Sequence, residues 1–278
     1  MNKILFVSAF YDINRNDWEK YGRSVDNYFK SFFILAKFIK YDLVVFIENK
    51  YLKLYANKLK SLKSKSSEGR LIIRNLDEIK NKLFLKKYQK IESSIINSKI
   101  YKSYLSEKTK NKPEHIYYQY NLINHDKVNF VNIAKNEFEG YKFYSWIDFG
   151  FAKDRDNNDI ERIPKNLNFD YIPNDKILYQ SLTKKITYVN AIQNLKSNDV
   201  HVQGTFWIVP NKLVEIYQEM YENELLNFHK KNIVDDDQNL VFQLIFKNPN
   251  KFILYYNKHF FSLYKNILNK PTISKLIN

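Results

Sequence analysis

Acidic side chains occur at two places in the sequence where their position favours metal binding or acid–base catalysis. Asp148 directly follows an apolar run at residues 141–147. A carboxylate at the end of a strand is well placed to hold a hard divalent cation, and such a cation bridges the oxygens of a diphosphate. Asp235, Asp236 and Asp237 open a stretch with a helical pattern. Acidic residues often cap helices, but three exceed what one cap needs, so we expect at least one to act as a base or to accept a substrate hydroxyl.

The loop after the first apolar run carries three side chains that suit a nucleotide. Tyr11, Asp12 and Arg15 follow the strand-like run at residues 3–8. An aromatic ring can stack on a base, a carboxylate can accept from a base or ribose, and a guanidinium can pair with phosphate. Ligands of open α/β sheets bind at the carboxyl ends of strands, so the position favours a binding loop over an ordinary solvated loop.

A glycine interrupts another apolar run. Gly204 lies within residues 201–209, directly after Gln203. A glycine inside a strand marks either a bulge or a place where a ligand approaches the backbone closely. The sequence leaves both interpretations open.

The five histidines show no spacing typical of a zinc site. We expect His125 and His229 to lie on helix surfaces. His259 follows the last predicted strand, where it could complete a metal site begun by Asp148.

Several kinds of site are excluded by what the sequence lacks. Cysteine is absent, which excludes disulfides, thiol catalysis and Cys-ligated metal centres. Asp148-Phe149-Gly150 also occurs in protein kinases, but the kinase glycine-rich loop and the His-Arg-Asp loop are missing. The 5 glycines form neither a P-loop nor a Gly-x-Ser-x-Gly elbow, which argues against P-loop NTPases and standard hydrolases.

The elements that must position these residues follow an α/β order. Nearly continuous short apolar runs predict strands buried on both faces of a sheet, and helical periodicity lies between them. Alternating strands and helices predict a mixed, mostly parallel sheet flanked by helices. Strands are predicted at residues 3–8, 43–47, 70–73, 141–147, 201–209 and 252–256. Helices are predicted at residues 24–40, 51–65, 76–110, 117–138, 210–228 and 235–246.

The 278 residues show no internal repeat and no linker. We therefore predict a single α/β domain over residues 1–257, followed by a basic tail over residues 258–278. No run approaches the ~18 apolar residues that span a bilayer. The first ten residues lead into polar sequence without a signal-peptide cleavage site, so we expect a cytoplasmic protein.

Five segments resemble a known family when they are taken together and in order. They read FVSAFYDINR at residues 6–15, HDKVNFVNIAK at 125–135, YSWIDFG at 144–150, QGTFW at 203–207 and DDDQNL at 235–240. Over residues 3–256 the chain is similar to the bacterial HtrL/YibB-like family, which is associated with lipopolysaccharide-core and capsule gene clusters. That family resembles nucleotide-sugar glycosyltransferases of the GT-A fold. The resemblance therefore implies a GT-A-like, Rossmann-type sheet.

The resemblance also implies roles on the donor side of the site. Asp12 and Arg15 would lie in the first nucleotide-binding loop, beside Tyr11. Lys127, on the helix before the strand that ends at Asp148, would face the donor diphosphate or the sugar.

Further roles are implied for the sugar and the acceptor. Gln203 and Gly204 would line the sugar pocket. Asp237 and Gln238 would face the transferred sugar or the acceptor, with Asp236 as a further catalytic candidate beside them.

The metal motif departs from the GT-A pattern. Asp148 matches the first residue of an Asp-x-Asp motif, but Gly150 stands where the second aspartate belongs. A site for Mn²⁺ or Mg²⁺ would then need help from Asp154, Asp156 or His259.

The charge of the chain is compatible with two classes of function. Its net charge of +15 suggests an anionic partner. The resemblance favours a metal-assisted glycosyltransferase that moves a sugar from a nucleotide-sugar donor to a lipopolysaccharide, lipooligosaccharide or capsule acceptor. The alternative is a non-enzymatic nucleic-acid-binding protein that uses the Lys-rich stretches at 58–65 and 80–90, but no nucleic-acid-binding motif supports it. The basic helices also predict a peripheral contact with an anionic membrane.

Overall fold

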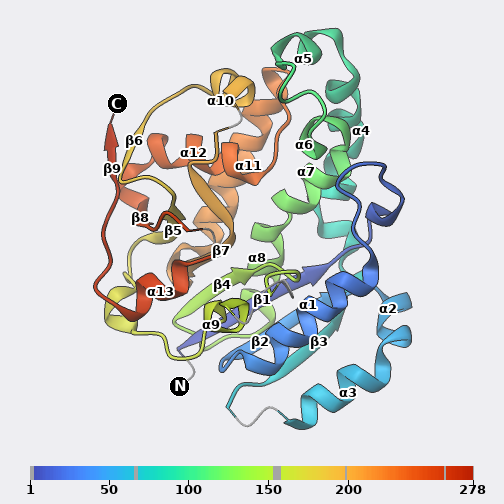
Figure 1. Cartoon of the computed structure of the whole chain (residues 1–278), viewed down its shortest axis with the longest axis vertical. Coiled ribbons are helices and arrows are strands. Elements are labelled where there is room, and N and C mark those ends of the chain that lie inside the picture. Colours follow the sequence, from blue (N-terminus) through green and yellow to red (C-terminus); the bar gives the residue numbers. More distant parts are fainter. Residues whose placement is uncertain (1–2, 66–67, 153–157, 198, 260, 278) are drawn as a thin grey trace.

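A seven-stranded sheet crosses the middle of the molecule (Figure 1). The computed structural model describes residues 3–65, 68–152, 158–197, 199–259 and 261–277. The strand order is β3-β2-β1-β4-β7-β5-β8, and β6 pairs with β9 in a second, small sheet. The strands of the large sheet are β1 (Ile4–Phe10), β2 (Asp42–Ile47), β3 (Leu71–Asn75), β4 (Phe143–Ile147), β5 (Ile177–Ser181), β7 (Val202–Pro210) and β8 (Phe252–Tyr256). The small sheet consists of β6 (Lys185–Thr187) and β9 (Lys275–Ile277).

The directions of the strands bring distant segments to one edge. β3, β2, β1 and β4 are mutually parallel, and so are β5 and β8. β7 runs antiparallel to β4 and to β5, so it begins at the edge where β1 and β4 end. β1 has β2 on one side and β4 on the other, so the order in which the chain adds strands reverses at β1. Open α/β sheets bind ligands at such a switch point.

The apolar runs form strands because both faces of the sheet are covered. Leu5 and Val7 of β1 belong to one core layer, whereas Ile4 and Phe6 belong to the other. Successive strand residues point to opposite faces, so a strand buried on both sides needs a continuous apolar run. The predicted mixed, mostly parallel sheet flanked by helices is confirmed.

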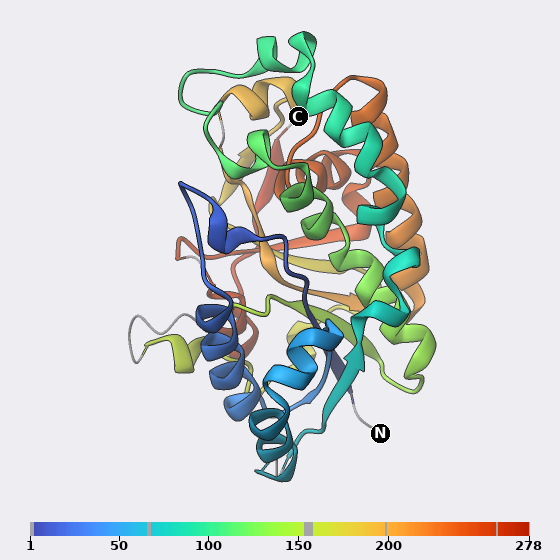
Figure 2. The same cartoon turned by 90° about the vertical axis from the view of Figure 1, so that its right-hand side faces the viewer.

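Helices cover the sheet from both sides (Figure 1). Figure 2 shows α4 running alongside α11, and both views place the C-terminal end of the chain in the upper half of the molecule and the N-terminal end in the lower half. The first core layer is closed by α4 (Phe84–Asn97), α5 (Lys99–Tyr104), α7 (Tyr118–His125), α8 (Lys127–Glu137), α10 (Ala191–Ser197), α11 (Val214–Lys230) and α12 (Asp237–Lys247). The second is closed mainly by α1 (Val25–Phe38), α2 (Asn49–Leu54), α3 (Ala56–Lys65) and α13 (Leu263–Leu268). The remaining short helices are α6 (Pro113–Ile116) and α9 (Asn158–Arg162).

Helices that periodicity predicted as continuous are divided in the structure. The stretch at 51–65 breaks between α2 and α3, and the stretch at 117–138 breaks at Asp126, between α7 and α8. The carboxylate of Asp126 accepts hydrogen bonds from the backbone N–H groups of Phe84 (2.6 Å) and Leu85 (3.0 Å). It thereby caps the start of α4, whose own N-cap residue is a leucine without a capping side chain. The tertiary contact fixes where α8 begins.

The prediction that His125 and His229 lie on helix surfaces is wrong. Both side chains are buried between α4, α7 and α11. His229 Nε2 lies 3.1 Å from Oε1 of the buried Glu92, and His125 Nδ1 lies 2.8 Å from the hydroxyl of Tyr221. Helical periodicity missed this because these helices are covered on more than one side.

The C-terminal segment packs onto the domain. Leu263, Tyr264 and Ile267 of α13 belong to the second core layer, and β9 pairs with β6. The division at residue 257 stays a prediction. Among the helices of the described residues, none is long and apolar enough to cross a membrane.

Candidate functional site

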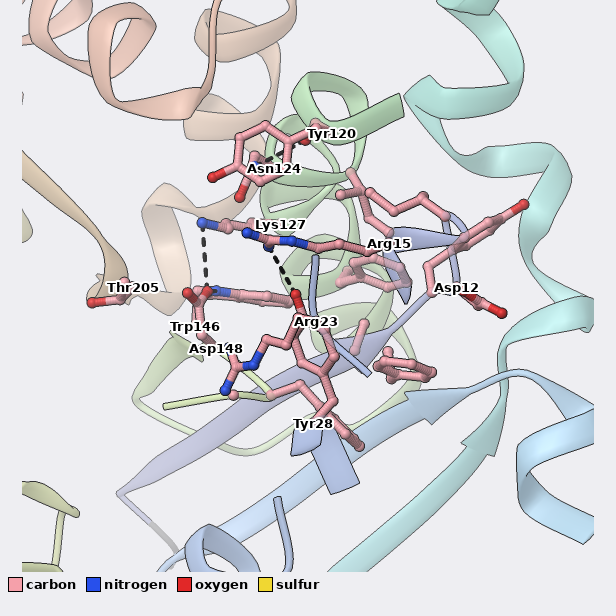
Figure 3. Close-up of a pocket in the computed structure, with 18 of the residues that line it drawn as sticks. Asp12, Arg15, Arg23, Tyr28, Tyr120, Asn124, Lys127, Trp146, Asp148 and Thr205 are labelled. Carbon is pink, nitrogen blue, oxygen red and sulfur yellow. Dashed lines mark hydrogen bonds and ion pairs between the residues drawn. The ribbon is translucent and has the colours of Figure 1, made fainter. Parts of the chain in front are cut away.

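A cavity of about 290 Å³ lies at the edge where β1 and β4 end. Its walls come from the loop after β1, the start of α1, the helices α7 and α8, the end of β4 and the start of β7. Figure 3 shows Lys127 near the centre of this group, with Asp12 and Thr205 on opposite sides. The topology therefore brings together residues that are far apart in the sequence.

Lys127 is the first residue of α8, and its ammonium group ends between two carboxylates, of which Figure 3 shows Asp148. Its Nζ lies 2.8 Å from Oδ2 of Asp237 and 3.4 Å from Oδ1 of Asp148. It also donates to the carbonyl oxygen of Gly204 at 3.2 Å. Burial favours the neutral amine, but Asp148 and Asp237 outweigh this effect and raise the pKa of Lys127. Lys127 is therefore a charged group in a mostly buried position.

Asp237 is the first residue of α12. It does not line the cavity itself, but it contacts Lys127, which does. Burial raises the pKa of its carboxyl group, while the nearby Lys127 opposes this rise. Asp237 also lies against the backbone of β7, because a Cβ at Gly204 would stand 2.2 Å from its Oδ2. The glycine therefore allows a carboxylate, rather than a ligand, to approach this part of the backbone, and a register shift between β5 and β7 accompanies it.

Of the two carboxylates around Lys127, Asp148 is the one that lines the cavity. Its side chain is 31% exposed, against 6% for Asp237. The indole N–H of Trp146 donates to its Oδ1 at 2.7 Å, and its backbone N–H donates to the carbonyl oxygen of Thr205 at 2.9 Å. These contacts hold the end of β4 against the start of β7.

The other acidic residues before α12 have structural partners. Asp236 is the N-cap and accepts from the backbone N–H of Gln238 at 3.0 Å. Asp235 accepts from the Asn239 side chain at 2.7 Å, and burial raises its pKa to about 7. Neither Asp236 nor Gln238 lines the cavity, so their predicted catalytic roles stay predictions.

The loop after β1 forms part of the cavity wall, and Asp12 ties this loop to α2. Tyr11, Asp12 and Arg15 all line the cavity. Asp12 accepts from the Lys50 ammonium at 2.9 Å and from the Tyr51 hydroxyl. Burial raises the pKa of Asp12, but the Tyr51 and Lys50 hydrogen bonds outweigh it and give a net lowering. In this structure Asp12 is thus an ionised anchor of the loop.

Gln203 and His259 lie outside the cavity walls. Gln203 is buried, and its Oε1 accepts from the Thr205 hydroxyl at 3.2 Å. Within the described part of the chain its Nε2 has no hydrogen-bond partner. His259 is exposed, and its backbone carbonyl accepts from Gln180 at 2.6 Å.

Among the polar lining residues, sequence reasoning missed Arg23, Tyr28, Tyr120, Asn124 and Thr205. Tyr120 and Asn124 precede Lys127 at the spacing of one helix face, so a signal for them existed. Arg23 lies in the polar loop before α1, where no local pattern indicates the direction of a side chain. It was found only through the tertiary structure.

Among the described residues, the donor set at the predicted metal site does not fit Mn²⁺ or Mg²⁺. Both ions need anionic oxygen ligands that are free of competing cations, and no group of three His or acidic side chains in the described chain could hold one. An ammonium group already lies near Asp148, and a Cβ at Gly150 would stand 2.9 Å from Nη1 of Arg23. Asp154 and Asp156 lie outside the described residues.

Sequence comparison identifies the family. A family model described as "Bacterial protein of unknown function (HtrL_YibB)" matches residues 2–267. The chain belongs to the HtrL_YibB family. The predicted resemblance is thus confirmed, although the description of the HtrL_YibB family gives it no activity. No curated protein sequence matches the chain.

One solved structure similar to this HtrL_YibB protein is 4-diphosphocytidyl-2C-methyl-D-erythritol synthase from Anaerococcus prevotii. The two are 9% identical, with a TM-score of 0.37. The match covers 94% of this chain and 89% of the other.

Proposed function

We propose that the protein is a glycosyltransferase that uses a nucleotide-sugar donor. The observation that carries this proposal is the set of cations in the cavity: Arg15, Arg23 and the buried Lys127 lie at the switch point of the sheet. Neither arginine is paired with a carboxylate among the described residues. Guanidinium groups in such a site suit the oxygens of a diphosphate.

The remainder of the cavity suits the other parts of a nucleotide sugar. Tyr11 and Tyr120 offer aromatic surface for a base, and Asn124 and Thr205 offer groups that can hydrogen-bond to hydroxyls. Asp148 faces the same space and can accept from a sugar hydroxyl. One cavity thus combines cations that suit a diphosphate with polar groups and a carboxylate that suit a sugar.

The proposed reaction replaces one bond to the anomeric carbon. The bond from that carbon to the β-phosphate oxygen breaks, and its electron pair stays on the departing nucleoside diphosphate. An acceptor hydroxyl oxygen forms the new glycosidic bond and loses its proton to a base. The cations stabilise the charge that develops on the leaving group, since fixed charges act strongly in a partly dry site. Asp148 is the carboxylate best exposed to take the proton.

Asp237 and Gly204 are positioning residues in this proposal. Asp237 holds the Lys127 ammonium from behind, and Gly204 provides both the space for Asp237 and a carbonyl acceptor for Lys127. No step is assigned to a metal ion, because the described donor set does not fit one.

The acceptor follows from the resemblance rather than from the cavity. A family associated with lipopolysaccharide-core and capsule gene clusters implies a surface glycan or glycolipid, and such acceptors are made beside an anionic membrane. The net charge of +15 is compatible with that partner.

Donor turnover tests the proposal. The protein is incubated with UDP-, GDP-, CDP- and dTDP-sugars, and release of the free nucleotide is followed with and without lipooligosaccharide. We expect turnover of one donor, faster with acceptor, and a loss of at least about 100-fold in Lys127→Met. Lys142→Met, an exposed lysine away from the cavity, is the matched control. Turnover of no donor, or equal turnover in Lys127→Met, would contradict the proposal.

A further inference from the structure

Arg23 lies where a second metal-binding carboxylate would be expected. A Cβ at Gly150 would stand 2.9 Å from Nη1 of Arg23 and 3.2 Å from Nη2. Any acidic side chain at position 150 would therefore project onto this guanidinium. The structure has a positive charge where an Asp-x-Asp motif would have a negative one.

The position of Arg23 is fixed by neighbours on α1. Its Nη2 donates to the Ser31 hydroxyl at 3.3 Å, and its guanidinium carbon lies 4.3 Å from the centre of the Tyr28 ring. The Ser31 hydroxyl is itself fixed, because it donates to the carbonyl oxygen of Asn27 at 3.0 Å. Within the described chain these contacts include no carboxylate, so the charge of Arg23 is not compensated.

Arg15 is held in the same way. Its Nη1 donates to the Tyr28 hydroxyl at 2.8 Å, and its Nε donates to the Tyr21 carbonyl oxygen at 2.9 Å. Its guanidinium also packs near the rings of Trp18 and Tyr120, with centroid distances of 5.3 and 5.4 Å. Tyr28 therefore supports both arginines, one through its ring and one through its hydroxyl (Figure 3).

Without the arginines, the charged groups of the cavity carry one net negative charge. Lys127 is paired with Asp148 and Asp237, and Asp12 is paired with Lys50. The two guanidinium groups more than offset this charge. Neither forms an ion pair with a carboxylate among the described residues, although Glu114 lies close enough to Arg15 to interact with it electrostatically. The diphosphate of a nucleotide sugar carries one negative charge on each phosphate, so each arginine can face one of these charges.

We propose that Arg15 and Arg23 together replace the divalent cation of this site and bind the donor diphosphate without a metal. This inference rests on the proposed use of a nucleotide-sugar donor. Planar guanidinium groups bind phosphate oxygens in pairs, and they stay charged at any physiological pH. When the glycosyl bond breaks, the electron pair moves to the β-phosphate oxygen, and the two arginines stabilise the added charge.

Calorimetric titration tests the inference through binding rather than activity. The protein is first treated with EDTA, and UDP, GDP, CDP and dTDP are then titrated in EDTA and in Mn²⁺. We expect at least one nucleotide to bind in both buffers. Its dissociation constant in EDTA should lie within about threefold of its dissociation constant in Mn²⁺. In EDTA, Arg23→Ala should weaken this binding at least about tenfold, because it removes a charge-assisted contact. Arg23→Lys should recover part of the loss.

Arg74→Ala is the matched control, since Arg74 pairs with Glu137 on the surface, outside the cavity. It should bind like the wild type, and thermal melting should show that every variant is folded. Binding that is at least about tenfold tighter in Mn²⁺, or that is unchanged in Arg23→Ala, would overturn the inference while leaving the nucleotide site intact. Failure of all four nucleotides to bind in either buffer would overturn the proposed function itself.

Discussion

At the scale of single residues, the site depends on the balance of charge around Lys127. One ammonium group lies between Asp148 and Asp237, and Asp237 is almost fully buried. A buried carboxylate that loses its partner is costly, whereas removal of both partners is much less so. The network can therefore be tested by a double-mutant cycle.

Lys127→Met should lower the free energy of unfolding by about 3–5 kcal/mol, because it leaves the Asp237 carboxylate buried without a cation. Lys127→Met/Asp237→Asn should regain most of this loss. Chemical denaturation of the four proteins measures the coupling. Lys135→Met, on the same helix but paired with the exposed Glu215, is the control and should cost less than about 1 kcal/mol. A loss no larger for Lys127→Met than for Lys135→Met would contradict the account.

Gly204→Ala tests the contact between β7 and α12. The new Cβ would stand 2.2 Å from Oδ2 of Asp237, so the carboxylate must move away from Lys127. We expect a loss of about 1–3 kcal/mol in the free energy of unfolding, together with loss of donor turnover. In an Asp237→Ala background the stability cost of Gly204→Ala should nearly disappear. An equal cost in both backgrounds would show that the clash lies elsewhere.

Sequence reasoning identified part of this residue-scale picture. It found Asp148, Lys127, Gly204 and Asp237. It predicted that Asp148 binds a metal ion and that Lys127 faces a phosphate, and it did not predict the ion pair between them. It missed Arg23, because the direction of a loop side chain is set by tertiary contacts. A pairing between Lys127 and Asp237 spans 110 residues and leaves no local signal.

At the scale of elements, α4, α7 and α11 meet around a buried glutamate. Glu92 on α4 is fully buried, and its nearest titratable neighbours, His229 and His125, lie 3.1 and 4.0 Å away. Burial lowers the pKa of His229 to about 4 and that of His125 to about 3, so both rings are neutral near neutral pH. Burial and the nearby Asp126 raise the pKa of Glu92 well above its usual value.

Glu92→Gln should therefore stabilise the protein more at pH 8 than at pH 5. A carboxyl group with a raised folded-state pKa contributes stability below its unfolded-state pKa, and this contribution is lost as the pH rises. Each pH unit crossed between the two pKa values is worth about 1.4 kcal/mol in the wild type, and glutamine avoids this cost. Urea denaturation at several pH values measures the difference. Glu139→Gln, at an exposed position, should show almost none, and a pH-independent effect of Glu92→Gln would refute the argument.

The positions of the strands and helices in the sequence were easier to predict than the residues at which they begin and end. Short apolar runs located β1, β2, β4, β7 and β8, because a sheet covered on both faces demands such runs. The break between α7 and α8 was not predictable, since it depends on Asp126 capping the distant α4. Lys127 is the first residue of α8 after that break.

At the scale of the whole molecule, the reversed strand β7 is what assembles the site. It brings Gly204 and Thr205 to the edge where β1 and β4 end, so that both sides of the cavity meet there. The C-terminal segment contributes to the same fold through Leu263, Tyr264 and Ile267.

Ile267→Ala should lower the free energy of unfolding by about 2–5 kcal/mol, because the side chain is fully buried in the second core layer. Thermal melting measures the effect, and the exposed Lys270→Ala serves as the control. Removal of residues 258–278 should destabilise the protein further. A melting temperature unchanged by either alteration would show that the tail is dispensable for the fold.

A thermal-shift titration shows whether the cavity binds a nucleotide-sugar donor. A ligand that binds the folded state raises stability by about 2.7 kcal/mol at a hundred times its dissociation constant. With UDP-, GDP-, CDP- and dTDP-sugars, we predict a concentration-dependent rise in melting temperature for at least one donor, and its loss in Arg15→Ala. No rise with any donor for the folded wild-type protein, or an equal rise in Arg15→Ala, would contradict the account.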